Sequence, residues 1–238
     1  MMLRSGVSGI FFRSIVACAF ALCATAASAA TILVYGDSLS AGYGLQPGQG
    51  WVSLLAKRLQ SEKLDYKVAN ASLSGETTHG GAKRIEAALK THHPVIVIVE
   101  LGANDGLRGG TVEKTRANLE AIVDACRKAG ARVVLVGIHL PPNYGMAYTD
   151  KFRQVFPDIA RQRKLALVPF LFEGFAEKPE YFQPDGLHPA ANAQPLMLDL
   201  VWKALRPLLR AYVRARRPGS ASRSRRTAAG QRRWSPGS

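Results

Sequence analysis

The chain contains the run Thr31-Ile32-Leu33-Val34-Tyr35-Gly36-Asp37-Ser38-Leu39-Ser40, in which an apolar, β-branched segment stops at a glycine and a serine follows on the turn. Segment 31–35 is apolar without alternation and too short for an amphipathic helix, so it predicts a buried strand of a parallel sheet. Ser38 then lies just beyond the carboxyl end of this strand, where open α/β sheets bind ligands. A Gly-x-Ser turn at that edge presents a hydroxyl to solvent, as a nucleophile requires. The alternative is a strand-ending turn in which Asp37 and Ser38 only cap the next segment.

Strand-like and helix-like patterns alternate along the rest of the chain. The expected strands cover 31–35, 66–70, 95–101, 133–137 and 165–168, and the expected helices cover 51–59, 78–91, 112–126, 149–163 and 190–212. This alternation predicts a doubly wound, three-layer α/β/α domain with a parallel sheet. Within the last helix, Pro195 is expected near the first turn and Pro207 is expected to cause a kink or a break. No Gly-x-Gly-x-x-Gly motif follows the first strand, which disfavours dinucleotide binding.

Residues 1–29 have the order of a secretory signal peptide. Two arginines precede an apolar core over 15–22, and small residues lead to Ala29, after which we expect cleavage. The apolar core is too short to span a bilayer, and no later segment reaches spanning length. We therefore expect a soluble mature protein in the periplasm or outside the cell.

The C-terminal segment 214–238 contains eight arginines and no acidic residue, together with many Ser, Gly, Pro and Ala residues. Such a segment buries too little apolar surface to offset its ordering entropy, so we expect it to be disordered. It supplies +8 and the leader +2 of the formal +15, which leaves +5 for the single domain expected over 30–213. Weak contact of the tail with anionic surfaces is one interpretation, but a solvated tail without a specific nucleic-acid partner is preferred.

Cleavage of the leader removes Cys18 and Cys23 and leaves Cys126 as the remaining cysteine. No intramolecular disulfide can then form, even in an oxidising compartment. Cys126 falls on the apolar face of an expected helix, and we interpret it as a buried structural thiol.

Parallel strands would bring the loops that follow them to one edge of the sheet. The residues of these loops that are suited to acyl transfer are Ser38, Gly75, Asn104, His139, Asp185 and His188. A serine nucleophile needs a base within hydrogen-bond reach, and the base needs a carboxylate to orient it. Asp185 and His188 share a short turn bounded by prolines, so one stiff piece of backbone can carry both. Ser38 and Gly75 can offer backbone N–H groups to an oxyanion, and Asn104 can offer its amide.

Four blocks of the chain occur in the order expected for a known family. They are Gly36-Asp37-Ser38-Leu39-Ser40, Gly75, Gly102-Ala103-Asn104-Asp105 and Asp185-Gly186-Leu187-His188-Pro189. In these blocks the chain resembles the GDSL, or SGNH, hydrolases, and the likeness covers nearly all of residues 31–210. Within the family it is most similar to bacterial periplasmic enzymes described as thioesterases, lysophospholipases and arylesterases.

The resemblance implies a catalytic role for each matching residue. Ser38 would be the nucleophile, His188 the base and Asp185 the carboxylate that orients the base. Ser38, Gly75 and Asn104 would form the oxyanion hole. The family also implies a flavodoxin-like, five-stranded sheet of order 2-1-3-4-5, with no metal or organic cofactor.

His139 is the rival base, because it lies at the same edge, but no carboxylate near it in sequence could orient it. His188 is therefore preferred. The other histidines have no partner at metal-ligand spacing and are expected on the surface: His79, His92 and His93. Asp37 and Asp105 adjoin the predicted catalytic positions and are interpreted as helix caps or Asx turns.

Four further residues are expected to border the substrate: Leu107, Leu140, Tyr144 and Leu187. They predict a shallow apolar groove for an extended acyl or aryl group, the alternative being simple loop packing. The expected function is that of an exported, monomeric serine esterase acting on small-molecule carboxylic esters and thioesters. The alternatives are a carbohydrate O-acetyl esterase and a protein that binds anionic polymers through its basic tail.

Overall fold

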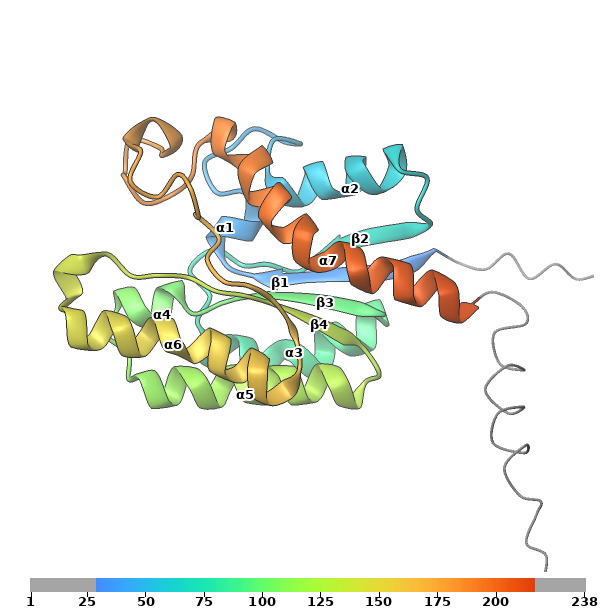
Figure 1. Cartoon of the computed structure of the whole chain (residues 1–238), viewed down its shortest axis with the longest axis horizontal. Helices are drawn as coiled ribbons and strands as arrows, with labels where there is room; N and C mark the ends of the chain where they lie inside the picture. Colours follow the sequence, from blue (N-terminus) through green and yellow to red (C-terminus); the bar gives the residue numbers. More distant parts are fainter. Residues whose placement is uncertain (1–28, 217–238) are drawn as a thin grey trace, which may run out of the picture.

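The computed structural model describes residues 29–216 and contains one parallel, five-stranded sheet (Figure 1). The strands are β1 (Ala30–Gly36), β2 (Tyr66–Asn70), β3 (Ile96–Glu100), β4 (Arg132–Val136) and β5 (Ala166–Val168). Their order across the sheet is β2-β1-β3-β4-β5, which confirms the predicted flavodoxin-like topology. All carboxyl ends of the strands therefore lie at one edge.

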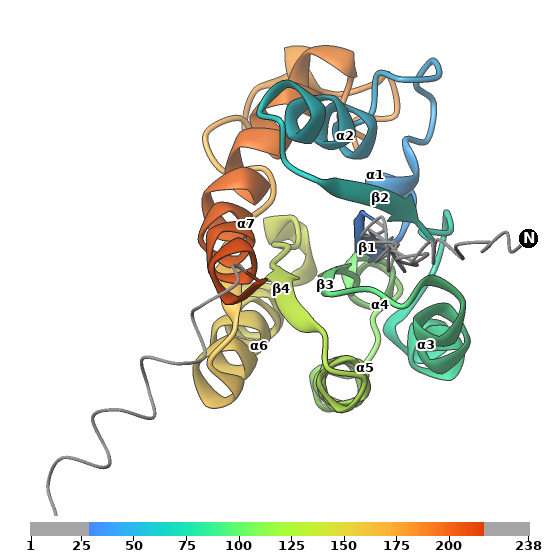
Figure 2. The same cartoon turned by 90° about the vertical axis from the view of Figure 1, so that its right-hand side faces the viewer.

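Helices cover both faces of the sheet, which confirms the three-layer prediction (Figure 2). One face carries α2 (Trp51–Ser61) and α7 (Gln194–Arg216), and the other carries α3 (Thr78–His92), α5 (Val112–Lys128) and α6 (Met146–Arg163). Two short helices follow strands directly: α1 (Ser38–Ala41) after β1 and α4 (Ala103–Leu107) after β3. The 3₁₀ turns cover Pro142–Tyr144, Pro179–Tyr181 and Ala191–Ala193. Over residues 29–216, no helix has both the length and the hydropathy needed to cross a bilayer.

The two central strands are buried along their whole length, because helices cover them from both sides. Every residue of β1 and β3 is buried, which is why their sequences are apolar without alternation. The helices instead bury one stripe, as in α2, where Trp51, Leu55 and Leu59 face the sheet. Cys126 of α5 lies wholly inside this core, and burial raises the pKa of its thiol to about 12, as a structural cysteine requires.

Helix α7 passes through Pro207 without a break, so of the predicted kink or break the break is wrong. Pro207 is exposed, and water can therefore hydrate the carbonyl group that loses its helical partner. The buried side chains of Val201, Leu205 and Leu209 hold the helix to the sheet on both sides of the proline. Pro195 lies in the first turn, as expected.

The two terminal predictions fall largely beyond the described residues. The signal peptide predicted over 1–29 and most of the tail predicted over 214–238 lie outside residues 29–216. Helix α7 ends at Arg216, so its last turn overlaps the first residues of the predicted tail.

The contact between β1 and β3 leaves no space for a side chain at Gly36. A Cβ atom there would lie 2.7 Å from Glu100 Oε2 and 2.8 Å from the Glu100 backbone oxygen. We expect Gly36→Ala to lower the free energy of unfolding by about 1–3 kcal/mol, because the strands must shift to relieve the overlap. Gly50→Ala is the control, since its Cβ would meet only an ordinary contact at 3.6 Å. Urea denaturation of both variants tests this, and equal losses would contradict it.

Candidate active site

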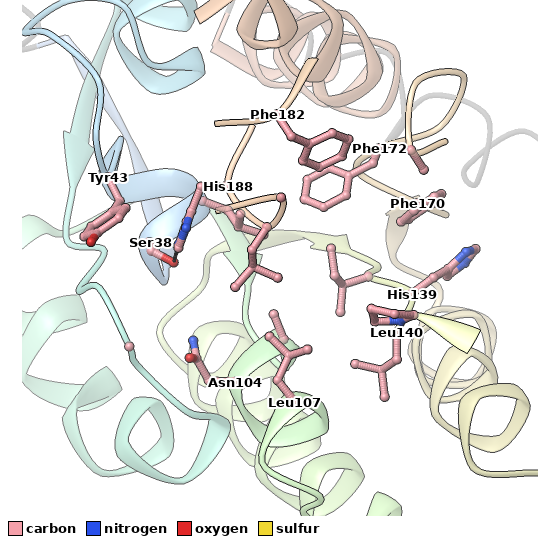
Figure 3. A pocket seen from close by; sticks show the side chains of 18 of the residues that line it. Ser38, Tyr43, Asn104, Leu107, His139, Leu140, Phe170, Phe172, Phe182 and His188 are labelled. Atoms are coloured by element: carbon pink, nitrogen blue, oxygen red, sulfur yellow. Dashed lines mark hydrogen bonds between the residues drawn. The ribbon is translucent and has the colours of Figure 1, made fainter. Parts of the chain in front are cut away.

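The carboxyl edge of the sheet brings a serine, a histidine and an aspartate into one hydrogen-bonded line. Figure 3 shows the first two, Ser38 and His188, at the pocket. Ser38 Oγ lies 3.0 Å from His188 Nε2, and His188 Nδ1 lies 2.7 Å from Asp185 Oδ2. Ser38 lies just after β1, as the first residue of α1, whereas His188 and Asp185 come from the segment after β5. A serine can lose its proton to a base held in this way.

Ser38 is placed by a sharp transition from strand to helix. It is the first residue of α1, directly after β1, and Asp37 is the N-cap whose Oδ1 accepts a hydrogen bond from Leu39 N at 3.0 Å. The cap predicted for Asp37 is therefore present, and the serine hydroxyl is half-buried at the edge of the cavity. The same turn therefore caps helix α1 with Asp37 and presents the hydroxyl of Ser38 to the cavity.

Asp185 and His188 are held together by an Asx turn. Asp185 Oδ1 accepts hydrogen bonds from Leu187 N at 2.9 Å and from His188 N at 3.0 Å, while Oδ2 faces the imidazole. Partial desolvation raises the pKa of Asp185, but these backbone bonds and the His188 ring lower it to about 2. Asp185 therefore remains ionised at neutral and mildly acidic pH, which fixes the proton of the imidazole on Nδ1.

Two residues that the sequence did not single out support this turn. Gln183 Nε2 donates to the backbone oxygens of Tyr43 at 2.8 Å and Pro189 at 3.2 Å, so it joins the loop after α1 to the histidine segment. The Tyr43 ring packs on the His188 ring with 4.5 Å between centroids. No periodicity in the sequence marks either residue, because both lie in irregular loops.

The predicted oxyanion donors line the same cavity as Ser38. Within residues 29–216, no protein group accepts a hydrogen bond from the backbone N–H of Ser38 or Gly75, so both remain available. The Asn104 amide is engaged, because Nδ2 donates to Asp37 Oδ2 at 3.2 Å and to the Glu76 backbone oxygen at 3.0 Å. The Asn104 amide is therefore held in one orientation, and its NH₂ group already donates to two protein acceptors.

A pair of buried carboxyl groups lies beneath the serine. Asp37 is fully buried and Glu100 is 2% exposed, and Ser40 Oγ donates to Glu100 Oε2 at 2.7 Å. Burial raises the pKa of Asp37 to about 6, although bonds from Leu39 and Asn104 oppose this, and burial raises the pKa of Glu100 well above its usual range. The folded pair therefore holds protons that the unfolded chain releases. The free energy of unfolding declines as the pH rises through about 6, where Asp37 ionises, and ionisation of Glu100 extends the loss to higher pH.

Sequence interpretation missed Glu100, although a signal was present. It is the acidic residue at the end of an otherwise apolar, buried strand. A charge in such a strand needs a partner, because ionised carboxylates are costly to bury alone. That requirement singles out Glu100 for a polar role at the carboxyl edge.

The other predicted residues divide between the site and its surroundings. Asp105 does act as a cap, but for the neighbouring helix α3, because its carboxylate accepts from Thr78 N at 2.8 Å and Thr78 Oγ1 at 2.6 Å. His139 lines the cavity but stacks on Phe170 at 3.9 Å, across the cavity from Ser38 (Figure 3). Over residues 29–216, no group of three or more His, Cys, Asp or Glu side chains could hold a metal ion.

An open cavity of about 590 Å³ extends from the serine, and most of its lining is apolar. Three of the residues expected to border the substrate line this cavity: Leu107, Leu140 and Leu187. Tyr144 does not line it and instead donates its hydroxyl to the Leu107 backbone oxygen at 3.0 Å. The opposite wall consists of aromatic residues from the irregular segment 169–184: Phe170, Phe172 and Phe182 (Figure 3).

Known proteins resemble this chain over the same region. The model of the GDSL-like Lipase/Acylhydrolase family matches residues 34–194. Esterase TesA of Pseudomonas aeruginosa is 50% identical over 183 residues, which cover 77% of this chain and 91% of that protein. Thioesterase 1/protease 1/lysophospholipase L1 of Escherichia coli is 42% identical over 184 residues, covering 77% of this chain and 87% of that protein. The crystal structure of psychrotrophic esterase EstA from Pseudoalteromonas sp., inhibited by monoethylphosphonate, has a TM-score of 0.72 at 42% identity and covers 76% of this chain and 98% of that one.

Gln183 offers a test of how the histidine segment is held. We expect Gln183→Ala to lower kcat for p-nitrophenyl esters by about 10-fold, because small displacements of a positioned base reduce the rate strongly. Gln60→Ala, at an exposed position of α2, is the matched control and should leave kcat at the wild-type value. Steady-state kinetics would contradict the bracing role if both variants had the same kcat.

Proposed function

We propose that this chain, which belongs to the GDSL-like lipase/acylhydrolase family and is an ester-hydrolysing enzyme, cleaves carboxylic esters and thioesters through an acyl-enzyme on Ser38. One observation carries the proposal: the line of hydrogen bonds from Ser38 Oγ through His188 to Asp185 opens on an apolar cavity. Each role below follows from that geometry.

In the first half-reaction, His188 Nε2 takes the proton of Ser38 Oγ as the oxygen attacks the carbonyl carbon. A tetrahedral intermediate forms, and its negative charge lies on the former carbonyl oxygen. The imidazolium then gives its proton to the departing alkoxide, phenoxide or thiolate. The acyl group remains bound to Ser38 Oγ as the acyl-enzyme. Asp185 stabilises the imidazolium and holds its tautomer, because its charge faces Nδ1 at 2.7 Å.

In the second half-reaction, a water molecule takes the place of the leaving group. His188 accepts a proton from this water as it attacks the acyl carbon, and returns the proton to Ser38 Oγ when the acid departs. The openness of the cavity supports this step, since water must reach the acyl-enzyme. No metal or organic cofactor is needed for either half-reaction.

The oxyanion is best stabilised by the backbone N–H groups of Ser38 and Gly75 together with the Asn104 amide. The first two are available as they stand. Asn104 must share or lengthen its bond to Asp37 or to the Glu76 carbonyl when the oxyanion forms. A donor oriented in advance costs little reorganisation at that moment.

The substrates are proposed to be small-molecule esters with an extended acyl chain or an aryl group. The leucines and phenylalanines of the cavity favour such groups, because burial of each methylene is worth about 0.8 kcal/mol. Similar proteins carry the names esterase, arylesterase and thioesterase/lysophospholipase, which fits this range. A carbohydrate O-acetyl esterase is the alternative. The long apolar wall disfavours it, because an acetyl group is too short to fill that wall.

We also propose export and a monomeric state for the catalytic domain over 30–213. The charge and apolar order of residues 1–29 supports cleavage of a signal peptide and location in the periplasm or outside the cell. The basic segment 214–238 is proposed to be a solvated tail that contacts anionic surfaces only weakly.

Substitutions in the hydrogen-bonded line test the mechanism. We expect Ser38→Ala and His188→Ala to lower kcat for p-nitrophenyl esters by at least about 10³-fold, since each removes a reacting group. We expect Asp185→Asn to lower kcat by about 10²-fold, less than the roughly 10⁴-fold typical of a buried carboxylate, because the Asp185 side chain is 41% exposed. A fluorophosphonate should add its mass to Ser38 in the wild type and not in Ser38→Ala. Activity retained in Ser38→Ala or His188→Ala would refute the mechanism.

The cavity predicts a dependence on acyl length. We expect kcat/KM to rise from acetyl to octanoyl p-nitrophenyl esters, by up to about fourfold for each methylene that is buried. Phe172→Ala should flatten this rise by removing part of the aromatic wall, while the acetyl ester serves as the internal control in each variant. A wild-type preference for acetyl would instead favour the carbohydrate esterase.

A further inference from the structure

Glu100 is a buried acid that the catalytic steps above do not use. It ends β3, directly beneath the turn that carries Ser38, and only 2% of its surface is exposed. Its Oε2 atom accepts a hydrogen bond from Ser40 Oγ at 2.7 Å and faces Asp37 N at 3.5 Å. The Glu100 carboxyl therefore lies against the backbone of Asp37, and the charge of each carboxyl group disfavours a charge on the other. A buried carboxyl with this many partners calls for a specific role.

The two carboxyl groups cannot both be charged. Neither takes part in an ion pair within residues 29–216, and both are almost completely buried. Adjacent buried carboxylates without a cation repel each other and lose hydration, so one of them retains a proton. The retained proton also enables one carboxyl group to donate a hydrogen bond to the other.

The contacts assign the charge to Asp37 and the proton to Glu100. Asp37 accepts N–H groups at both oxygens, from Leu39 at 3.0 Å and from Asn104 at 3.2 Å, and such bonds favour an ionised carboxylate. The nearby His188 also lowers the pKa of Asp37 and so favours its ionised form. Burial raises the pKa of Glu100 well above its ordinary value, and that of Asp37 only to about 6.

Asp37 in turn decides which way the Asn104 amide faces. Its carboxylate and the Glu76 carbonyl are both acceptors, so they hold the NH₂ group and would repel the amide oxygen. A flipped Asn104 would place oxygen where the oxyanion needs a donor. The orientation of this donor therefore depends on a carboxylate that must itself be held in place.

We propose that Glu100 is a positioning residue for ester hydrolysis: as a neutral acid it donates a hydrogen bond to Asp37 and so fixes the carboxylate that orients the Asn104 amide. The inference rests on the proposed role of Asn104 at the oxyanion. It also limits the charge beneath the site to one, since a second carboxylate would oppose the negative charge that develops on the substrate.

Two substitutions at position 100 separate the hydrogen bond from the volume. Glu100→Gln keeps a neutral donor of nearly the same shape, and it should retain at least about one third of the wild-type kcat. Glu100→Met keeps the length but cannot donate, and it should lower kcat by about 10- to 100-fold with KM changed less than about threefold. The inference is overturned if Glu100→Met matches Glu100→Gln, or if Glu100→Gln is as impaired as Glu100→Met.

A double-mutant cycle tests whether Glu100 acts through the amide. In an Asn104→Ala background, Glu100→Met should cost no more than about a further threefold in kcat, because the group that it positions is already gone. A general loss of structure would instead repeat the full 10- to 100-fold effect, and that result would refute the inference. Failure of the proposed function looks different, since Asn104→Ala or Ser38→Ala would then keep full activity.

Infrared spectroscopy detects the protonation state of Glu100 directly and does not depend on catalysis. At neutral pH, the wild-type spectrum minus that of Glu100→Gln should contain the carbonyl band of a neutral carboxylic acid. Glu62→Gln, at an exposed position, is the matched control, and its difference spectrum should contain the bands of an ionised carboxylate and lack the carbonyl band of a neutral acid. If Glu100→Gln gives the same difference spectrum as Glu62→Gln, Glu100 is ionised and the inference fails. This comparison decides the matter even if Glu100→Met does not fold.

Discussion

The pairing of β1 with β3 is the constraint on which the site depends. Gly36 lies opposite Glu100 where the two strands end, and the absence of a side chain at Gly36 lets the strands meet closely there. Ser38 follows one strand and Asn104 follows the other, so the sheet's own hydrogen bonds set the distance between the nucleophile and the donor amide. The buried acid pair lies at the same junction. Rigid strands, rather than flexible loops, thus carry the parts that tolerate the least displacement.

The fold was largely predictable, because each level of the sequence favoured the same architecture. The central strands are almost entirely apolar, whereas the helices carry one apolar stripe. Strands and helices could therefore be distinguished from the spacing of apolar residues in the sequence. Pro207 shows where this reading fails. The local rule predicts disruption, but the cost depends on whether the freed carbonyl reaches water, and only the position of α7 on the sheet determines that.

The site was predictable to a different extent in its different parts. The corner with Asp185 and His188 could be recognised because its geometry is local, over one short turn. Tyr43, Gln183 and Glu100 could not be assigned in the same way, because their contacts join segments that are distant in sequence. The aromatic segment 169–184 was visible as a composition, but its direction toward the cavity depends on how the irregular backbone folds.

The bridge between Phe182 and Pro189 closes the histidine corner into a self-contained loop. The chain before the bridge supplies Phe170 and Phe172 to the cavity wall, whereas the loop itself holds the acid and the base in fixed relation. Insertions or deletions before the bridge can therefore reshape the wall while the proton-transfer unit keeps its form. Most of the aromatic wall and the proton-transfer unit thus belong to neighbouring parts of one segment, which makes this fold well suited to the evolution of new ester specificities.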